Sequence, residues 1–151
     1  MALPPFQTFL DRHAAELLRF LVAMVGREEA EDCFQETCLA ALRGYPRLPD
    51  DADLRAWAFT IARRKAIDAG RARRRRAIPV AEADRGGTTI VPDREAWAPL
   101  AALSPKQRAA VFLRVAAGLP HREVAQVLAC SEEAARRSAH EGLKRLREEM
   151  R

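Results

Sequence analysis

An arginine-rich run from Leu54 to Arg76 holds the residues of this chain that are best suited to bind a polyanion. Its apolar residues repeat at helical spacing: Leu54, Trp57, Ala58, Ile61, Ala62 and Ala69. A second, mostly basic set lies about a third of a turn or more away: Thr60, Arg63, Arg64, Ile67, Arg71 and Arg74. The spacing predicts a helix that packs on a core with one face and offers guanidinium groups to phosphates with the other. A solvated charged face without a ligand is the alternative.

The net charge of +5 is unevenly distributed along the chain. Residues 1–50 carry 5 basic and 8 acidic groups, whereas residues 51–80 carry 9 and 3. Residues 81–104 are again acidic, and residues 105–151 are again basic. We expect the basic segments to meet nucleic acid and the acidic ones to meet protein.

The residues that usually perform catalysis or bind metals are scattered. The chain has three cysteines, Cys33, Cys38 and Cys130, without metal-site spacing or the even number that a disulfide framework needs. The histidines are isolated, and no phosphate-binding glycine loop occurs. We therefore expect no metal, no cofactor and no enzyme activity.

The chain shows no sign of membrane insertion or export. No apolar run approaches the roughly 18 residues of a membrane span, and the first residues lack the pattern of a signal peptide. Together with the unpaired cysteines, this predicts a cytoplasmic protein.

Periodicity predicts an all-α fold of two small helical domains joined by a flexible linker. Helices are expected at 6–25, which Gly26 ends, at 28–42 and at 54–76. Residues 77–92 contain Pro79, Gly86, Gly87 and Pro92 without a sustained period, so they are the predicted linker between domains at 1–76 and 93–151.

The helix expected at 28–42 has two different faces. The inward face is small and apolar: Ala30, Cys33, Phe34, Thr37, Cys38 and Ala41. The outward face mixes acids, an amide and a leucine: Asp32, Gln35, Glu36, Leu39 and Arg43. Such a mixture fits a protein interface better than DNA, although a solvated surface with one stray leucine is also possible.

The last 47 residues predict a helix-turn-helix. Ser104 and Gln107 form a capping box, with Pro105 at the first helical position. A second helix is expected at 121–129, and Ser131 is a good N-cap for a longer basic helix at 132–149. The outward residues of that last helix are Arg136, Arg137, His140 and Lys144. The usual turn glycine is missing, with Ala129 and Cys130 in its place, and an ordinary helical hairpin is the alternative.

The order and spacing of these segments resemble a bacterial sigma factor of the extracytoplasmic-function group, the minimal kind with only regions two and four. Residues 32–39 are similar to the region-two motif D-x-x-Q-[ED]-T-F-L. Residues 54–63 resemble its W-L-x-x-I-A-R-N segment, and Asp68 with residues 71–76 resembles its D-x-x-R-R-x-R tail. Residues 103–108, 123–125 and 143–147 match the region-four pattern.

The resemblance implies a protein that binds core RNA polymerase and directs promoter-specific initiation. Asp32, Gln35, Glu36 and Leu39 would bind the beta-prime clamp, and region four would meet the beta flap. Arg63, Arg64, Arg71, Arg74 and, in the preceding loop, Tyr45 would recognise and melt the −10 element. Arg122, Arg136, Arg137, His140 and Lys144 would bind the −35 element. An anti-sigma factor is the further expected partner.

Two departures from the family pattern concern sequence readout. Arg64 stands where the family usually has an asparagine, so that contact would favour guanine or phosphate over adenine. Ala134, Ala135 and Ser138 replace more typical threonine, valine and arginine, which predicts unusual or modest upstream specificity. A stand-alone dimeric helix-turn-helix regulator is the alternative function, although no seam for a dimer is evident.

Overall fold

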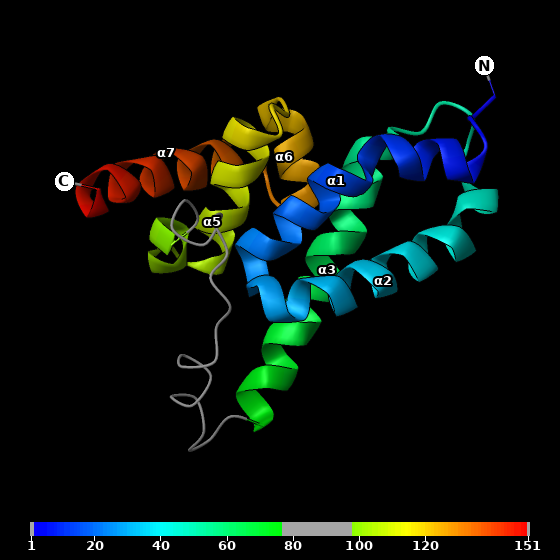
Figure 1. The fold of residues 1–151 in the computed structure, drawn as a ribbon. Coiled ribbons are helices and arrows are strands. Elements are labelled where there is room, and N and C mark those ends of the chain that lie inside the picture. The colour runs from blue at the N-terminus through cyan, green and yellow to red at the C-terminus, as the bar shows by residue number, and fades with distance from the viewer. Residues whose placement is uncertain (1, 77–97, 151) are drawn as a thin grey trace.

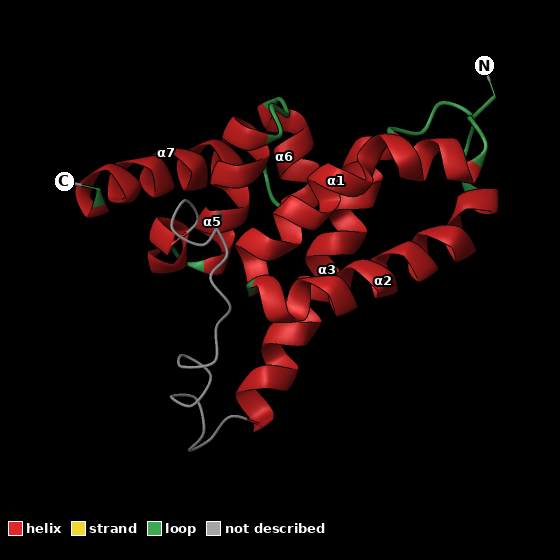
Figure 2. Cartoon of the chain, viewed as in Figure 1, coloured by secondary structure: helices red, strands yellow, loops and turns green. Residues whose placement is uncertain are grey.

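The computed structural model describes residues 2–76 and 98–150, and within them every regular element is helical (Figures 1 and 2). Six α-helices occur in these two ranges, which confirms the predicted all-α fold. The predicted linker, residues 77–92, and the proposed start of the second domain at 93 lie outside the described residues.

The first two helices are separated by a single glycine. Helix α1 (Phe6–Val25) has the predicted limits, and Gly26 ends it with a φ of 85° that favours glycine. Helix α2 (Arg27–Gly44) follows at once and is longer than the predicted 28–42. Glu28 and Glu29 lie in its first turn, where carboxylates stabilise the positive end of a helix.

A short 3-10 helix, η1 (Tyr45–Arg47), leads toward α3 (Leu54–Arg76), whose limits are again those predicted. Asp53 caps α3, because its Oδ1 accepts a hydrogen bond from the Ala56 N–H at 3.1 Å. At about 1.5 Å per residue, this 23-residue helix is roughly 35 Å long.

The C-terminal helices begin with η3 (Ala98–Ala102) and α5 (Pro105–Val111). The predicted capping box is present: Ser104 Oγ accepts from Gln107 N at 3.2 Å, and Gln107 Oε1 accepts from Ser104 N at 3.4 Å. The chain then widens into a π-helical turn, η4 (Phe112–Ala116), that the periodicity did not reveal.

Helices α6 (His121–Leu128) and α7 (Glu132–Glu149) form the predicted helix-turn-helix. Ala129 takes the left-handed conformation at the turn, with φ 55° and ψ 48°. Its N–H donates to Gln126 O at 3.3 Å, and the Cys130 N–H donates to Ala125 O at 3.1 Å. These two bonds are those of a Schellman turn, so Ala129 occupies a position that usually holds glycine.

Small residues let α7 approach its neighbours closely. Ala125, Ala135 and Ala139 are buried as the sequence predicted. Gly142 is buried too, and a Cβ atom built there would lie only 2.6 Å from Val111 Cγ2 of α5. Gly142 therefore sets the distance between α5 and α7, a role that its place in the sequence did not predict.

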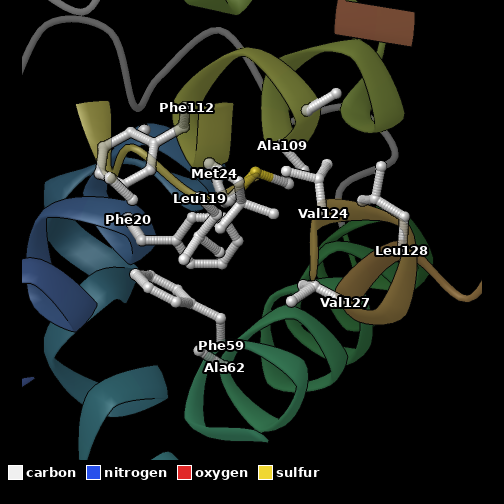
Figure 3. Close-up of a cluster of buried hydrophobic side chains, with 14 of the residues drawn as sticks. Phe20, Met24, Phe59, Ala62, Ala109, Phe112, Leu119, Val124, Val127 and Leu128 are labelled. Carbon is white, nitrogen blue, oxygen red and sulfur yellow. The ribbon is translucent and has the colours of Figure 1, made fainter. Parts of the chain in front are cut away.

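The buried face of α3 is wider than the predicted stripe. Phe59 is fully buried, and Ala56 and Ala66 are buried beside it, although none of the three belonged to the predicted apolar set. Helix α3 is covered on more than one side, by α1 and α2 and also by α6. Helices from both ends of the chain thus share one hydrophobic core, part of which Figure 3 shows.

Candidate protein-binding and nucleic-acid-binding surfaces

Helix α2 carries the predicted acidic surface on the side away from the core. Asp32, Gln35, Glu36 and Leu39 are all exposed, with Leu39 at 52%. The opposite side is anchored by Cys33 and Thr37, both buried. Figure 1 shows α2 at the edge of the molecule, apart from α5, α6 and α7. A partner can therefore reach the whole stripe.

Leu42 extends this surface, although it was not among the predicted residues. It lies three residues after Leu39, on the same side of the helix, and is also 52% exposed. Two exposed leucines at helical spacing form an apolar end to an otherwise polar stripe. Exposed large apolar side chains gathered in this way indicate a contact site for protein. The i, i+3 spacing of the two leucines was the available signal.

Helix α3 presents its predicted guanidinium groups in two environments. Arg64, Arg71 and Arg74 are exposed, and the end of the helix projects beyond α2 (Figure 1). Arg63 is only half-exposed, and burial lowers its pKa while the nearby Cys130 thiol acts in the opposite direction. Arg63 therefore lies close to the turn between α6 and α7.

The lower end of α3 is tied to α2 by a weak ion pair. Arg73 Nε lies 3.6 Å from Glu29 Oε1, and both groups are partly exposed. Such surface pairs contribute about 0–1 kcal/mol to stability, so this pair holds the helix end only weakly. Four consecutive arginines, residues 73–76, close the helix. Cations in the last turn also stabilise the helix, because they lie near the negative end of its dipole.

Tyr45 lies in a cluster of aromatic side chains. Its ring centroid is 5.3 Å from that of Phe6, 5.5 Å from that of Phe9 and 6.2 Å from that of Trp57. The Tyr45 hydroxyl donates a hydrogen bond to the Pro4 carbonyl. Stacking of Tyr45 on a DNA base would require this cluster to open, so its DNA-binding role stays a prediction.

Helix α7 presents the second basic surface. Arg136, Arg137, His140 and Lys144 are all exposed on it, and Arg122 is exposed near the start of α6. Ser131 caps the helix by accepting a hydrogen bond from Ala134 N at 3.0 Å. This cap fixes the direction in which the first turns of α7 point.

Two guanidinium groups of α7 are paired with carboxylates one turn earlier. Arg136 Nη2 lies 3.2 Å from Glu132 Oε1, and Arg137 Nη2 lies 3.7 Å from Glu133 Oε1. Both pairs are well exposed, and i, i+4 pairs of this kind stabilise a helix by only about 0.3–0.5 kcal/mol. A phosphate could displace either carboxylate at little cost.

The surroundings of Cys33 and Cys38 disfavour the thiolate form of both side chains. Burial and the neighbouring carboxylates of Glu29, Glu36 and Asp32 raise the pKa of Cys33 to about 11. Burial also raises the pKa of Cys38. Cys33 therefore packs as a small apolar side chain.

Within the described ranges, no three histidine, cysteine, aspartate or glutamate residues gather as a metal site would need. Among the helices described, none combines the length and the hydropathy needed to cross a membrane.

Comparison with known families and structures gives matches over both parts of the chain. The model of sigma-70 region 2 matches residues 9–76, and a model of sigma-70 region 4 matches residues 94–146. The extracytoplasmic-function (ECF) RNA polymerase sigma factor SigX of Bacillus subtilis is 30% identical over 96% of this chain and 83% of its own length. The ECF sigma factor ShbA of Streptomyces griseus is 37% identical over 80% of this chain and 71% of its own length.

Solved structures share the fold at lower identity. The sigma factor RpoE of Bartonella quintana, solved with the anti-sigma factor NepR, superposes with a TM-score of 0.80 at 23% identity over 95% of this chain and 94% of its own. CnrH, solved with the cytosolic domain of CnrY, gives a TM-score of 0.75 at 20% identity over 96% of this chain and 86% of its own.

Proposed function

This chain belongs to the extracytoplasmic-function group of the sigma-70 family and directs promoter-specific transcription, and we propose how its surfaces share that task. Residues 1–76 and 93–151 act as the two binding units, joined by residues 77–92. The two family models support this division, since one matches residues 9–76 and the other residues 94–146. The observation that supports the sharing of the task is the separation of the surfaces. An acidic, leucine-ended stripe lies on α2, while exposed guanidinium groups lie on α3 and α7.

The stripe on α2 binds the beta-prime clamp of core RNA polymerase through Asp32, Gln35, Glu36 and Leu39. Carboxylates and an amide beside an exposed leucine combine polar contacts with an apolar anchor, as protein interfaces do. Leu42 adds a second apolar contact to the same surface, since it is equally exposed.

Replacing both Gln35 and Glu36 with alanine tests this assignment. The double variant should bind core polymerase on the order of tenfold more weakly, the loss expected for contacts worth about 1.4 kcal/mol. A matched control is Gln7→Ala with Asp11→Ala, which removes an amide and a carboxylate from the exposed face of α1. Equal retention of both double variants by immobilised polymerase would refute the clamp assignment.

The basic surface of α3 binds and melts the −10 element through Arg63, Arg64, Arg71 and Arg74. Guanidinium groups contact phosphates and guanine edges in flat, bidentate geometry. Tyr45 joins them only if its aromatic cluster rearranges. Melting of the duplex then follows from preferential binding of the displaced single strand.

Helix α7 enters the major groove of the −35 element with its N-terminal half. Arg136, Arg137 and His140 face the DNA there, Lys144 follows one turn later on α7, and Arg122 contacts the backbone. The beta flap of polymerase holds the same unit near the upstream DNA.

The remaining partners and the location follow from the family. An anti-sigma factor is the expected regulator, since RpoE was solved with the anti-sigma factor NepR and CnrH with the cytosolic domain of CnrY. The protein works in the cytoplasm, where polymerase and promoter DNA are. It performs no reaction itself, because polymerase carries out the chemistry.

Run-off transcription from a promoter library with purified core polymerase tests the whole proposal. The chain should confer start sites that share two elements. The dimeric regulator is the less favoured alternative, because the region-two match accounts for residues 9–76, which such a regulator would not need. That alternative would gain support if the chain footprinted a palindrome without polymerase and conferred no start site.

A further inference from the structure

Two ion pairs follow one another at the start of α7, and they differ in how far they reach into solvent. Glu132 pairs with Arg136, and their side chains are 54% and 60% exposed. Glu133 pairs with Arg137, and their side chains are 84% and 64% exposed. Glu133 is therefore the more accessible of the two carboxylates, although both lie in the first turn of the helix.

The second of these pairs points directly away from the protein. The buried residues Ala135, Ala139 and Gly142 mark the side of α7 that packs on α5 and α6. At about 100° per residue, Glu133 and Arg137 both lie within roughly 30° of the opposite direction. A ligand that approaches the exposed side of α7 therefore meets this pair first.

The first pair lies at the flank of α7, beside the start of α6. Burial lowers the pKa of His121, the first residue of α6, and the guanidinium groups of Arg114 and Arg136 lower it further, while the Glu132 carboxylate raises it. Arg136 Nη2 also donates a hydrogen bond to Glu132 Oε1 at 3.2 Å. Neighbours within the protein thus orient this pair.

An exposed carboxylate in the major groove has few possible partners. It only accepts hydrogen bonds, and phosphates repel it. The N4 amino group of cytosine is the base donor that it suits best, whereas arginine donates to O6 and N7 of guanine. Since N4 of cytosine and O6 of guanine lie side by side in one base pair, a glutamate and an arginine in contact match a C·G pair as a unit. Arg137 Nη2 and Glu133 Oε1 are 3.7 Å apart, close enough to reach one pair together.

Resting on the proposed function, in which α7 enters the major groove of the −35 element, we propose that Glu133 determines sequence specificity by reading one C·G base pair together with Arg137. The Glu133 carboxylate accepts a hydrogen bond from cytosine N4, and the Arg137 guanidinium donates to guanine O6 and N7. The place of Glu133 in the first turn supports this role, because recognition helices contact base edges with their N-terminal residues. Glu132 stabilises the positive end of the helix from its flank and reads no base.

Glu133→Gln tests this assignment, because an amide suits the N6 and N7 groups of adenine better than cytosine N4. The matched control is Glu132→Gln, which removes the same charge from the same helical turn. Each protein is assembled with core polymerase and transcribes a promoter library with a randomised −35 element, and the transcribed templates are sequenced. Wild type and E132Q should enrich a C·G pair at one position, and E133Q should reduce that enrichment on the order of tenfold while A·T gains there.

A second variant tests whether the two side chains read the same base pair. Arg137→Ala should weaken the preference for C·G at the position that E133Q alters and leave the other positions as they are. The proposal is refuted if E133Q and E132Q enrich the same base pair at every position, or if E133Q and R137A alter different positions. Failure of the proposed function would show differently, as wild-type holoenzyme whose transcribed templates share no upstream element.

Discussion

The turn between α6 and α7 contains a residue whose replacement should stabilise the protein. Ala129 has φ 55° and ψ 48°, a conformation that costs a residue with a Cβ about 1–2 kcal/mol. Its methyl group is exposed, so Ala129→Gly loses little burial. Glycine has more backbone freedom to lose on folding, a penalty of about 0.5–1 kcal/mol. The balance predicts a gain of about 0.5–1 kcal/mol in the free energy of unfolding.

For a chain of this size, that gain should raise the melting temperature by roughly 1–4 °C. Thermal and urea denaturation, followed by circular dichroism, measure both quantities. Gly118→Ala is the opposite control: its φ is 72° and a Cβ there would meet nothing within 4 Å, so only the backbone cost remains. We expect G118A to lose about 1 kcal/mol. A lower or unchanged stability of A129G, with G118A destabilised as expected, would refute the strain at Ala129.

Three other changes test separate features. Gly142→Ala should cost about 1–3 kcal/mol in urea denaturation, because its Cβ would lie 2.6 Å from a Val111 methyl group. Glu123→Gln, which leaves the Asp53 cap in place, should raise the free energy of unfolding at pH 7 by less than about 1 kcal/mol. The reason is that the neighbouring Asp53 carboxyl, whose own pKa is lowered, raises the pKa of Glu123, so stability from Glu123 is present at acidic pH and is lost as the pH rises through the raised value. The advantage of E123Q should therefore shrink as denaturation is repeated toward pH 4. Replacing Arg71 and Arg74 with alanine should flatten the salt dependence of promoter binding by polymerase holoenzyme, by on the order of one logarithmic unit per lost phosphate contact; an unaltered slope in filter binding would mean that both side chains face only water.

The helix boundaries could be predicted well because their causes are local. Gly26 ends α1, Asp53 caps α3, and Ser104 with Gln107 opens α5, all from residues within one turn of the boundary. The exposed faces of α2 and α7 could be predicted for the same reason, since periodicity within one helix separates inward from outward residues.

The parts that were missed depend on distant segments. Phe59 lies off the apolar stripe that periodicity indicates on α3, yet it is buried because its ring packs against Phe20 of α1, earlier in the chain. Tyr45 is occupied by Pro4 and Phe6, some 40 residues earlier in the chain. The closeness of α5 and α7 at Gly142 likewise requires knowledge of which helices cross. Periodicity describes one helix at a time and carries no information about its neighbours.

The alanines of α3 keep its covered side narrow. Ala56, Ala58, Ala62 and Ala66 are all buried, and each presents a single methyl group to the helices packed on α3. A larger side chain at any of these positions would push a neighbouring helix away, at a cost of about 1–3 kcal/mol. Exposed positions of the same helix, such as Arg64 and Arg71, can be exchanged without disturbing that packing, so its outer surface can be redesigned while the core stays as it is.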